Sequence, residues 1–177
     1  MCGCNKMKLN YGGGDGGGGG GEGFRNYSES SGGDSIQTYD TSVWGAYTWT
    51  ALHIASIRSP NIALWRELSE ALANDLPCPE CRAHYADWLS KNPLRTTSYL
   101  PLRRMMRRDT NVGPIIINWL VTLHNDVSTS LGKPTWSTQQ VYDRYGGDRA
   151  SEGRDALGNV NGILGQKSYD LIMRLLS

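Results

Sequence analysis

The chain has 177 residues, a formal net charge of +1 and 38% hydrophobic residues. This length suits one domain with tails, and the near-neutral charge gives no general attraction to nucleic acid or to a membrane surface. The longest apolar stretch, around GPIIINWLVTL, is far too short for a membrane span. The N-terminus lacks the basic and apolar regions of a secretory signal, and four cysteines are too few for a secreted disulfide scaffold.

Residues 1–40 are predicted to form a flexible tail. Thirteen of the 22 glycines lie in residues 1–33, so this segment has almost no side chains to bury in return for the entropy of ordering it. The tip of the tail carries Cys2 and Cys4 in a CGC motif. A flexible tether of about 35 residues has a root-mean-square reach of about 30–35 Å, which spans a small domain.

The rest of the chain shows helical periodicity and no alternating pattern of strands. Three helices are predicted over 43–58, 62–74 and 78–91, with Pro60 and Pro77 between them. The third helix opens with the sequence CPEC, where a proline suits the first helical turn.

The second half of the chain is predicted to add further helices. The segment 92–112 contains a basic run that suits a short helix, and a longer helix is predicted over 114–132. A short helix follows in TQQVYDRY. An exposed loop is predicted over 146–166, before a terminal helix in KSYDLIMRLL, so that 146–177 forms an extension of the domain.

These elements predict an all-α fold, a small bundle of four or five helices in residues 41–145. Large aromatic side chains at helical spacing are first explained as core, and this applies to Trp44, Trp65, Trp88 and Trp119. Four arginines within 103–108 form two i, i+4 pairs. Such a run is typical of a solvated helix face, and otherwise of a docking patch for an acidic partner.

The pair Cys78 and Cys81 is the main candidate for chemistry. Two intervening residues allow a disulfide, and a helix N-terminus favours the thiolate form, so the pair can cycle between dithiol and disulfide. Zinc is the alternative, because Cys78, Cys81 and His84 are ligand types at suitable spacing, with His53 or His124 as the fourth ligand. An inert buried pair is the third possibility, and the pair alone does not decide among them.

Three segments resemble, in order, three blocks of the Erv/ALR family of FAD-dependent sulfhydryl oxidases. They are VWGAYTWTALHIAS, LPCPECRAHYADWL and NWLVTLHNDVSTSLGKPTW. The second contains C-x-x-C-x-x-H-[FY], a form found in the quiescin branch of the family. The three blocks cover residues 43–137, and the compact domain resembles the members from large DNA viruses.

The resemblance implies a helical bundle that holds FAD with its flavin ring beside the cysteine pair. Cys81 would face the flavin, and Cys78 would be attacked by incoming thiolates. The residues that the resemblance assigns to the cofactor are Trp49, His53, Glu80, His84, His124, Asn125, Val127, Ser128, Leu131, Lys133 and Trp136. The family usually has Asn where this chain has Ser128, and it often has a structural Cys where this chain has Ser137.

The implied function is a thiol oxidase that forms disulfides in protein substrates, a thioredoxin-like protein among them, and passes electrons to oxygen to give hydrogen peroxide. Cys2 and Cys4 would be a shuttle pair, with palmitoylation, metal binding or no specific role as the alternatives. The resemblance also implies a homodimer. A metal site, a membrane span and nucleic-acid binding are not expected. The alternatives are a zinc-stabilised, non-enzymatic interaction module and a degenerate family member that serves as a structural virion component. The expected location is the cytoplasm, including a virus factory or virion, with the mitochondrial intermembrane space as the alternative.

Overall fold

A computed structural model describes residues 41–94 and 113–177, and its regular structure in these ranges is helical. The helices are α1 (Thr41–Arg58), α2 (Ile62–Asp75), α3 (Pro79–Lys91), α5 (Gly113–Ser130), α6 (Thr138–Tyr145), α7 (Ala150–Gly158) and α8 (Gln166–Leu176). The all-α prediction is confirmed, although the described residues form seven helices and not four or five. No helix in these two ranges is long and apolar enough to cross a membrane.

Two predicted features lie outside the described residues. The tail with Cys2 and Cys4 is one, and the basic run of arginines within 103–108 is the other.

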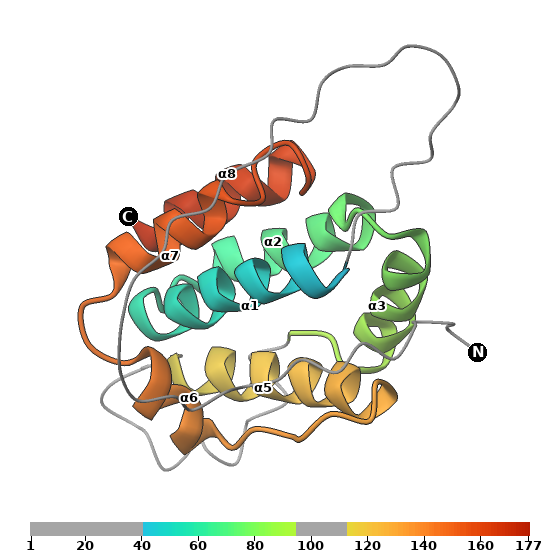
Figure 1. Ribbon diagram of the computed structural model, residues 1–177, viewed down its shortest axis with the longest axis horizontal. Coiled ribbons are helices and arrows are strands. Elements are labelled where there is room, and N and C mark those ends of the chain that lie inside the picture. The colour runs from blue at the N-terminus through green and yellow to red at the C-terminus, as the bar shows by residue number, and fades with distance from the viewer. Residues whose placement is uncertain (1–40, 95–112) are drawn as a thin grey trace, which may run out of the picture. The chain divides into compact units, whose positions relative to one another are not determined.

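Helix α1 lies at the centre of the bundle. Its six consecutive residues 51–56 are all buried, whereas a helix packed on one side only buries a single stripe. Neighbours on two sides explain this burial. Figure 1 shows α5 and α6 on one side of α1 and α7 and α8 on the other. The four tryptophans that were predicted as core are buried.

Local side chains fix where the helices begin. Pro79 occupies the first turn of α3, as predicted, and the Cys78 sulfur accepts a hydrogen bond from the backbone N–H of Cys81 at 3.1 Å. At the start of α6, Ser137 and Gln140 form a reciprocal capping box. These caps satisfy backbone N–H groups that have no partner within the helix.

The prediction of an exposed loop over residues 146–166 is wrong. Nine of these residues form α7, which buries Ala150, Gly153, Ala156 and Leu157. Three of these four residues are alanine or glycine, which carry little apolar surface, so the hydrophobic signal of this face is weak in the sequence. The predicted terminal helix is confirmed as α8, and it buries Leu171, Ile172, Leu175 and Leu176.

Candidate active site

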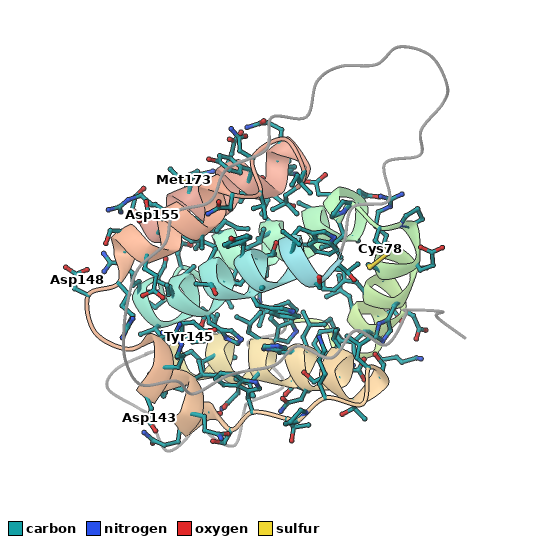
Figure 2. The ribbon with its side chains drawn as sticks, viewed as in Figure 1. Cys78, Asp143, Tyr145, Asp148, Asp155 and Met173 are labelled. Carbon is teal, nitrogen blue, oxygen red and sulfur yellow. A yellow bond between two sulfur atoms is a disulfide. The ribbon has the colours of Figure 1, made fainter. Side chains whose placement is uncertain are left out.

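Cys78 and Cys81 form a disulfide at the N-terminal end of α3, with their Cα atoms 5.1 Å apart. Figure 2 shows this disulfide in yellow beside the label of Cys78. Both side chains are half-buried and pack against the hydrophobic core. The exposed Glu80 places a carboxylate oxygen 3.4 Å from the Cys78 sulfur. The pair is therefore a disulfide that is supported from one side by the core and is accessible from the other.

Five flat rings gather where α1, α5 and α6 meet, and we call them the ring cluster: Trp49, His53, His124, Trp136 and Tyr145. The rings of Trp49 and His124 stack with centroids 4.1 Å apart and an interplanar angle of 8°. His53 stacks on Tyr145 at 5.2 Å and 16°, and His124 on Trp136 at 6.1 Å and 18°. Figure 2 shows Tyr145 on α6, on the side facing α1. Near-parallel planes of this kind suit a flat aromatic ligand.

The two histidines of the ring cluster are bonded to each other. The distance between His53 Nε2 and His124 Nδ1 is 2.8 Å, so one ring donates and the other accepts. Burial, and then the neighbouring His124, lowers the pKa of His53 to about 3. Burial, and then the charge of Lys133, lowers the pKa of His124 to about 4. Both rings are therefore neutral at pH 7.

One nitrogen of this pair has no partner within the described residues. His53 is fully buried, and its Nδ1 atom makes no hydrogen bond there. An unpaired polar atom in the interior costs free energy. A ligand that offers a donor or acceptor at this point would recover that cost.

Asn125 ties the segment after α5 to the ring cluster. Its amide nitrogen donates to the Trp136 carbonyl oxygen at 2.8 Å, and its amide oxygen accepts from the Trp136 backbone N–H at 2.7 Å. This pair of hydrogen bonds fixes the backbone at Trp136 and so positions the indole. Asn125 therefore acts on the ring cluster through Trp136.

A groove with a volume of about 600 Å³ runs between α3 and α5. Its lining includes His84, Asp87 and Lys91 from α3, and Asn125 and Asp126 from α5. His84 Nε2 lies 2.8 Å from Asp126 Oδ2 and joins the two helices at this groove. The groove contains two of the predicted cofactor residues, His84 and Asn125, and it has the size of a small-molecule site.

The remaining predicted cofactor residues lie near the C-terminal end of α5. Val127 is half-buried, Ser128 is buried, and Leu131 and Lys133 are exposed. The backbone N–H of Lys133 donates to the Ser128 carbonyl oxygen at 2.8 Å, which turns the chain back at this end. The contacts of these residues with a cofactor stay predictions.

Two residues of the site were not predicted from the sequence. The sequence contains a pattern that could have predicted the position of Tyr145: it follows Val141 by four residues and so shares the buried face of α6 with it. No sequence pattern could have predicted the role of Asp126, because its partner His84 lies 42 positions away and a single sequence does not show such pairings.

The zinc alternative finds no support in this geometry. Its cysteines are joined in a disulfide, and two of its histidines, His53 and His124, are bonded to each other. Within residues 41–94 and 113–177, no three metal-ligating side chains come together.

A comparison with protein families connects this site to known proteins. The Erv1 / Alr family model matches residues 46–146. The match takes in more than half of the chain, and it includes the disulfide and the whole ring cluster. The chain belongs to the Erv1/Alr family.

Named relatives of this Erv1/Alr chain occur in plants and in large DNA viruses. The "FAD-linked sulfhydryl oxidase ERV1" of Oryza sativa subsp. japonica is 30% identical over 108 residues, which are 58% of this chain and 48% of that protein. The "FAD-linked sulfhydryl oxidase" of African swine fever virus (isolate Warthog/Namibia/Wart80/1980) is 29% identical over 110 residues, covering 57% of this chain and 81% of the viral protein. A relative also occurs in Acanthamoeba polyphaga mimivirus, at 29% identity over 96 residues.

The extent of these matches differs between the relatives. This Erv1/Alr chain spans about half of the rice protein and most of the African swine fever virus protein. No solved structure matches the chain significantly. The family match ends at residue 146, so α7 and α8 lie beyond it.

Proposed function

We propose that this chain is an FAD-linked thiol oxidase that forms disulfides in protein dithiols. One observation carries the proposal: a half-buried, accessible disulfide lies at a helix N-terminus within the part of the chain that matches the Erv1/Alr family. The printed names of the plant and viral relatives, FAD-linked sulfhydryl oxidases, support it. An inert structural disulfide explains neither the unpaired His53 nitrogen nor the aligned rings.

The residues present fit FAD. The ring cluster offers planes for a flat aromatic system, and the unpaired His53 Nδ1 offers one hydrogen bond. The groove beside His84 and Asn125 has room for a further part of the molecule, and the exposed Lys133 offers a cation to a phosphate group. We assign the cofactor to these residues.

The disulfide performs the first chemical step. A substrate thiolate attacks the Cys78 sulfur, which breaks the Cys78–Cys81 bond and forms a mixed disulfide with Cys78. Cys81 leaves as a thiolate. The second substrate thiol, as its thiolate, then attacks the substrate sulfur of the mixed disulfide, which releases an oxidised substrate and leaves both cysteines reduced.

The surroundings of the two sulfurs differ, although both sulfurs lie at the N-terminus of α3 and the Cys78 sulfur also accepts the backbone N–H of Cys81. Cys81 lies in the first turn of α3, where the helix dipole stabilises a thiolate. The carboxylate of Glu80 lies beside the Cys78 sulfur and repels a second negative charge there. The Glu80 carboxylate is the local feature that disfavours charge on Cys78, and it supports Cys81 as the sulfur that faces the cofactor, the role that the family resemblance gives it.

Bound FAD would supply the acceptor for the two electrons of the reduced pair and their route to oxygen, which would give hydrogen peroxide. The protein holds the reacting groups in place. Because His53 and His124 are neutral at pH 7, they add no positive charge to the ring cluster.

Cys2 and Cys4 are proposed as a shuttle pair that takes electrons from bulky substrates and delivers them to Cys78. This proposal rests on the CGC motif and the glycine-rich tether alone, because both cysteines lie outside the described residues. A thioredoxin-like protein is the proposed type of substrate.

Three further expectations stay predictions. They are the homodimer, the location in the cytoplasm, a virus factory or a virion, and the alternative location in the mitochondrial intermembrane space. A catalytically inactive virion component would share the fold, so activity has to be measured.

The test is aerobic oxidation of dithiothreitol by the purified full-length chain, measured with matched Cys81→Ser and Cys78→Ser variants. The parent should retain flavin through purification and turn over. Both variants should retain flavin and lose at least about 100-fold in turnover, because each lacks one sulfur of the exchange. Turnover by Cys81→Ser at the parental rate would refute the assigned chemistry.

A further inference from the structure

A short connection between α2 and α3 leads directly into the redox pair. Asp75 is the last residue of α2, and Cys78 caps the first turn of α3. We call residues 75–77 the connecting segment. Cys78 is the sulfur that substrate thiolates attack in the proposed function, so the groups that hold the connecting segment also hold the attacked sulfur.

Each carbonyl oxygen of the connecting segment accepts a hydrogen bond. Arg82 Nη1, on α3, donates to the Leu76 carbonyl oxygen at 2.6 Å and to the Pro77 carbonyl oxygen at 3.5 Å. The Asp75 carbonyl oxygen accepts the backbone N–H of Gly165 at 2.9 Å, just before α8. The segment is therefore held from two sides, by α3 itself and by a helix from the C-terminal part of the chain.

The side chain of Asp75 adds a second bond to α8, which lies beside α2 in Figure 1. Its Oδ2 atom accepts the backbone N–H of Ser168 at 2.7 Å, one of the first-turn donors that have no partner within the helix. A Cβ atom on Gly165 would overlap the Asp75 side chain. The backbone angles of Gly165, φ −58° and ψ 142°, suit any residue. The close approach to Asp75 therefore explains the glycine at this position.

The disulfide fixes Cys78 only while it is closed. Once a substrate thiolate has opened it, the position of Cys78 depends on the backbone around it. A fixed backbone keeps the two sulfurs near each other and so raises the effective concentration at which they meet again. We propose that Asp75 is a positioning residue for the redox pair, and that α8 favours the closed disulfide through Asp75.

This support comes from a part of the chain that the family match does not include. The match ends at residue 146, and Gly165 and Ser168 lie beyond it. The inference rests on the proposed function and deepens it, since a positioning role for Asp75 requires that the disulfide opens and closes. The coupling has to act in both directions, so opening the disulfide loosens the bonds between Asp75 and α8.

Equilibrium with glutathione measures this coupling. In an anaerobic buffer, two glutathione molecules reduce the Cys78–Cys81 disulfide to two thiols and become one glutathione disulfide. Alkylation and mass spectrometry of the peptide that contains both cysteines give the equilibrium constant for the full-length chain as purified. Asp75→Ala should shift this constant toward the dithiol by about threefold or more, because it removes a charge-assisted hydrogen bond that favours closure.

Two further variants are the controls. Glu67→Ala removes an ion pair with Lys167 between the same two helices, and Glu67 lies about two turns before Asp75, so its equilibrium constant should be parental. Asp75→Asn retains an acceptor oxygen and should shift the constant less than Asp75→Ala. A merely structural role for Asp75 would lower stability and leave the constant unchanged. A parental constant in Asp75→Ala, or an equal shift in Glu67→Ala, would overturn the proposal.

Hydrogen exchange of the parent decides the matter if Asp75→Ala does not fold. The amides of Gly165 and Ser168 should exchange faster in the reduced parent than in the oxidised parent, whereas the amide of Gly153, which bonds within α7 and its cap, should exchange equally in both. Equal exchange of the Gly165 and Ser168 amides in the two states would overturn the proposal. Failure of the proposed function would appear separately, as a parent without flavin or turnover, because exchange with glutathione needs no flavin.

Discussion

At the scale of single residues, His53 and His124 connect stability with the proposed cofactor. Each histidine is held neutral by burial, and each contributes a ring to the same stack. A lone histidine in a helical sequence is more often a core residue than a ligand contact. Here the two histidines bond to each other across α1 and α5, and His53 keeps one nitrogen free of partners within the described residues.

Replacing either histidine should weaken cofactor binding and stability together. His53→Ala and His124→Ala each remove a ring from the stack and leave the other histidine without its partner. A tenfold loss of FAD affinity should lower the free energy of unfolding at saturating cofactor by about 1.4 kcal/mol. Flavin retention on gel filtration and thermal melting with added FAD measure the two effects. Parental values of both quantities in both variants would place the histidines outside the cofactor site.

Acid should destabilise the fold through His53. Its pKa is about 3 in the folded chain and about 6.5 when unfolded, so the unfolded state binds the proton first as the pH falls. The stabilisation is fully present above pH 6.5 and is lost as the pH falls toward 3. The loss between pH 6.5 and 5 is about 2 kcal/mol. Urea unfolding at several pH values should show it, and His53→Asn should flatten that part of the curve. An equally steep curve for His53→Asn would assign the acid sensitivity to other groups.

At the scale of helices and the segments between them, the sequence predicted where helices begin better than it predicted which helices contact each other. Pro79 at the start of α3 is such a local signal, and it was interpreted correctly. The C-terminal extension was misjudged, because the buried face of α7 consists largely of small residues that pack closely without a strong apolar pattern. Contacts between distant segments, such as His84 with Asp126, are invisible in one sequence because nothing local marks them.

The segment that leads into α6 should depend on Asn125. Asn125→Ala removes both hydrogen bonds to the Trp136 backbone, which should cost about 2 kcal/mol of folding free energy and loosen the indole of Trp136. Urea unfolding and flavin retention are the measurements. Asn161→Ala is the control, because Asn161 is exposed in the turn between α7 and α8. Equal stability and flavin retention in the two variants would show that the two hydrogen bonds from Asn125 to the Trp136 backbone are unimportant.

At the scale of the whole molecule, family membership follows from three sequence blocks that are far apart along the chain. The fold brings the second and third blocks to opposite walls of one groove, and it stacks rings from the first and third. The resemblance therefore named four residues whose rings the fold brings together, Trp49, His53, His124 and Trp136, although spacing within any single block was too weak to do so. The addition of α7 and α8 to this core had no counterpart in the blocks, and its packing on α1 and α2 became clear only from the structure.

The glycine-rich tail should matter for large substrates and not for small ones. Deleting residues 1–35 should leave dithiothreitol oxidation within a few-fold of the parent, because a small thiol reaches Cys78 directly. The same deletion should slow oxidation of a thioredoxin-like dithiol much more, since a tethered pair acts at an effective concentration of about millimolar. A double Cys2→Ser, Cys4→Ser variant separates the sulfurs from the glycines and should behave like the deletion. Undiminished oxidation of the protein dithiol by both would rule out a shuttle.

The central claim is that electrons pass from thiols through the Cys78–Cys81 pair to FAD and then to oxygen. The most direct measurement follows thiol loss, oxygen uptake and peroxide in one reaction with the purified, flavin-containing chain. We predict two thiols lost for each oxygen consumed and each peroxide formed, with no turnover in Cys81→Ser. A colourless parent protein, or thiol loss that continues without oxygen uptake, would contradict the account.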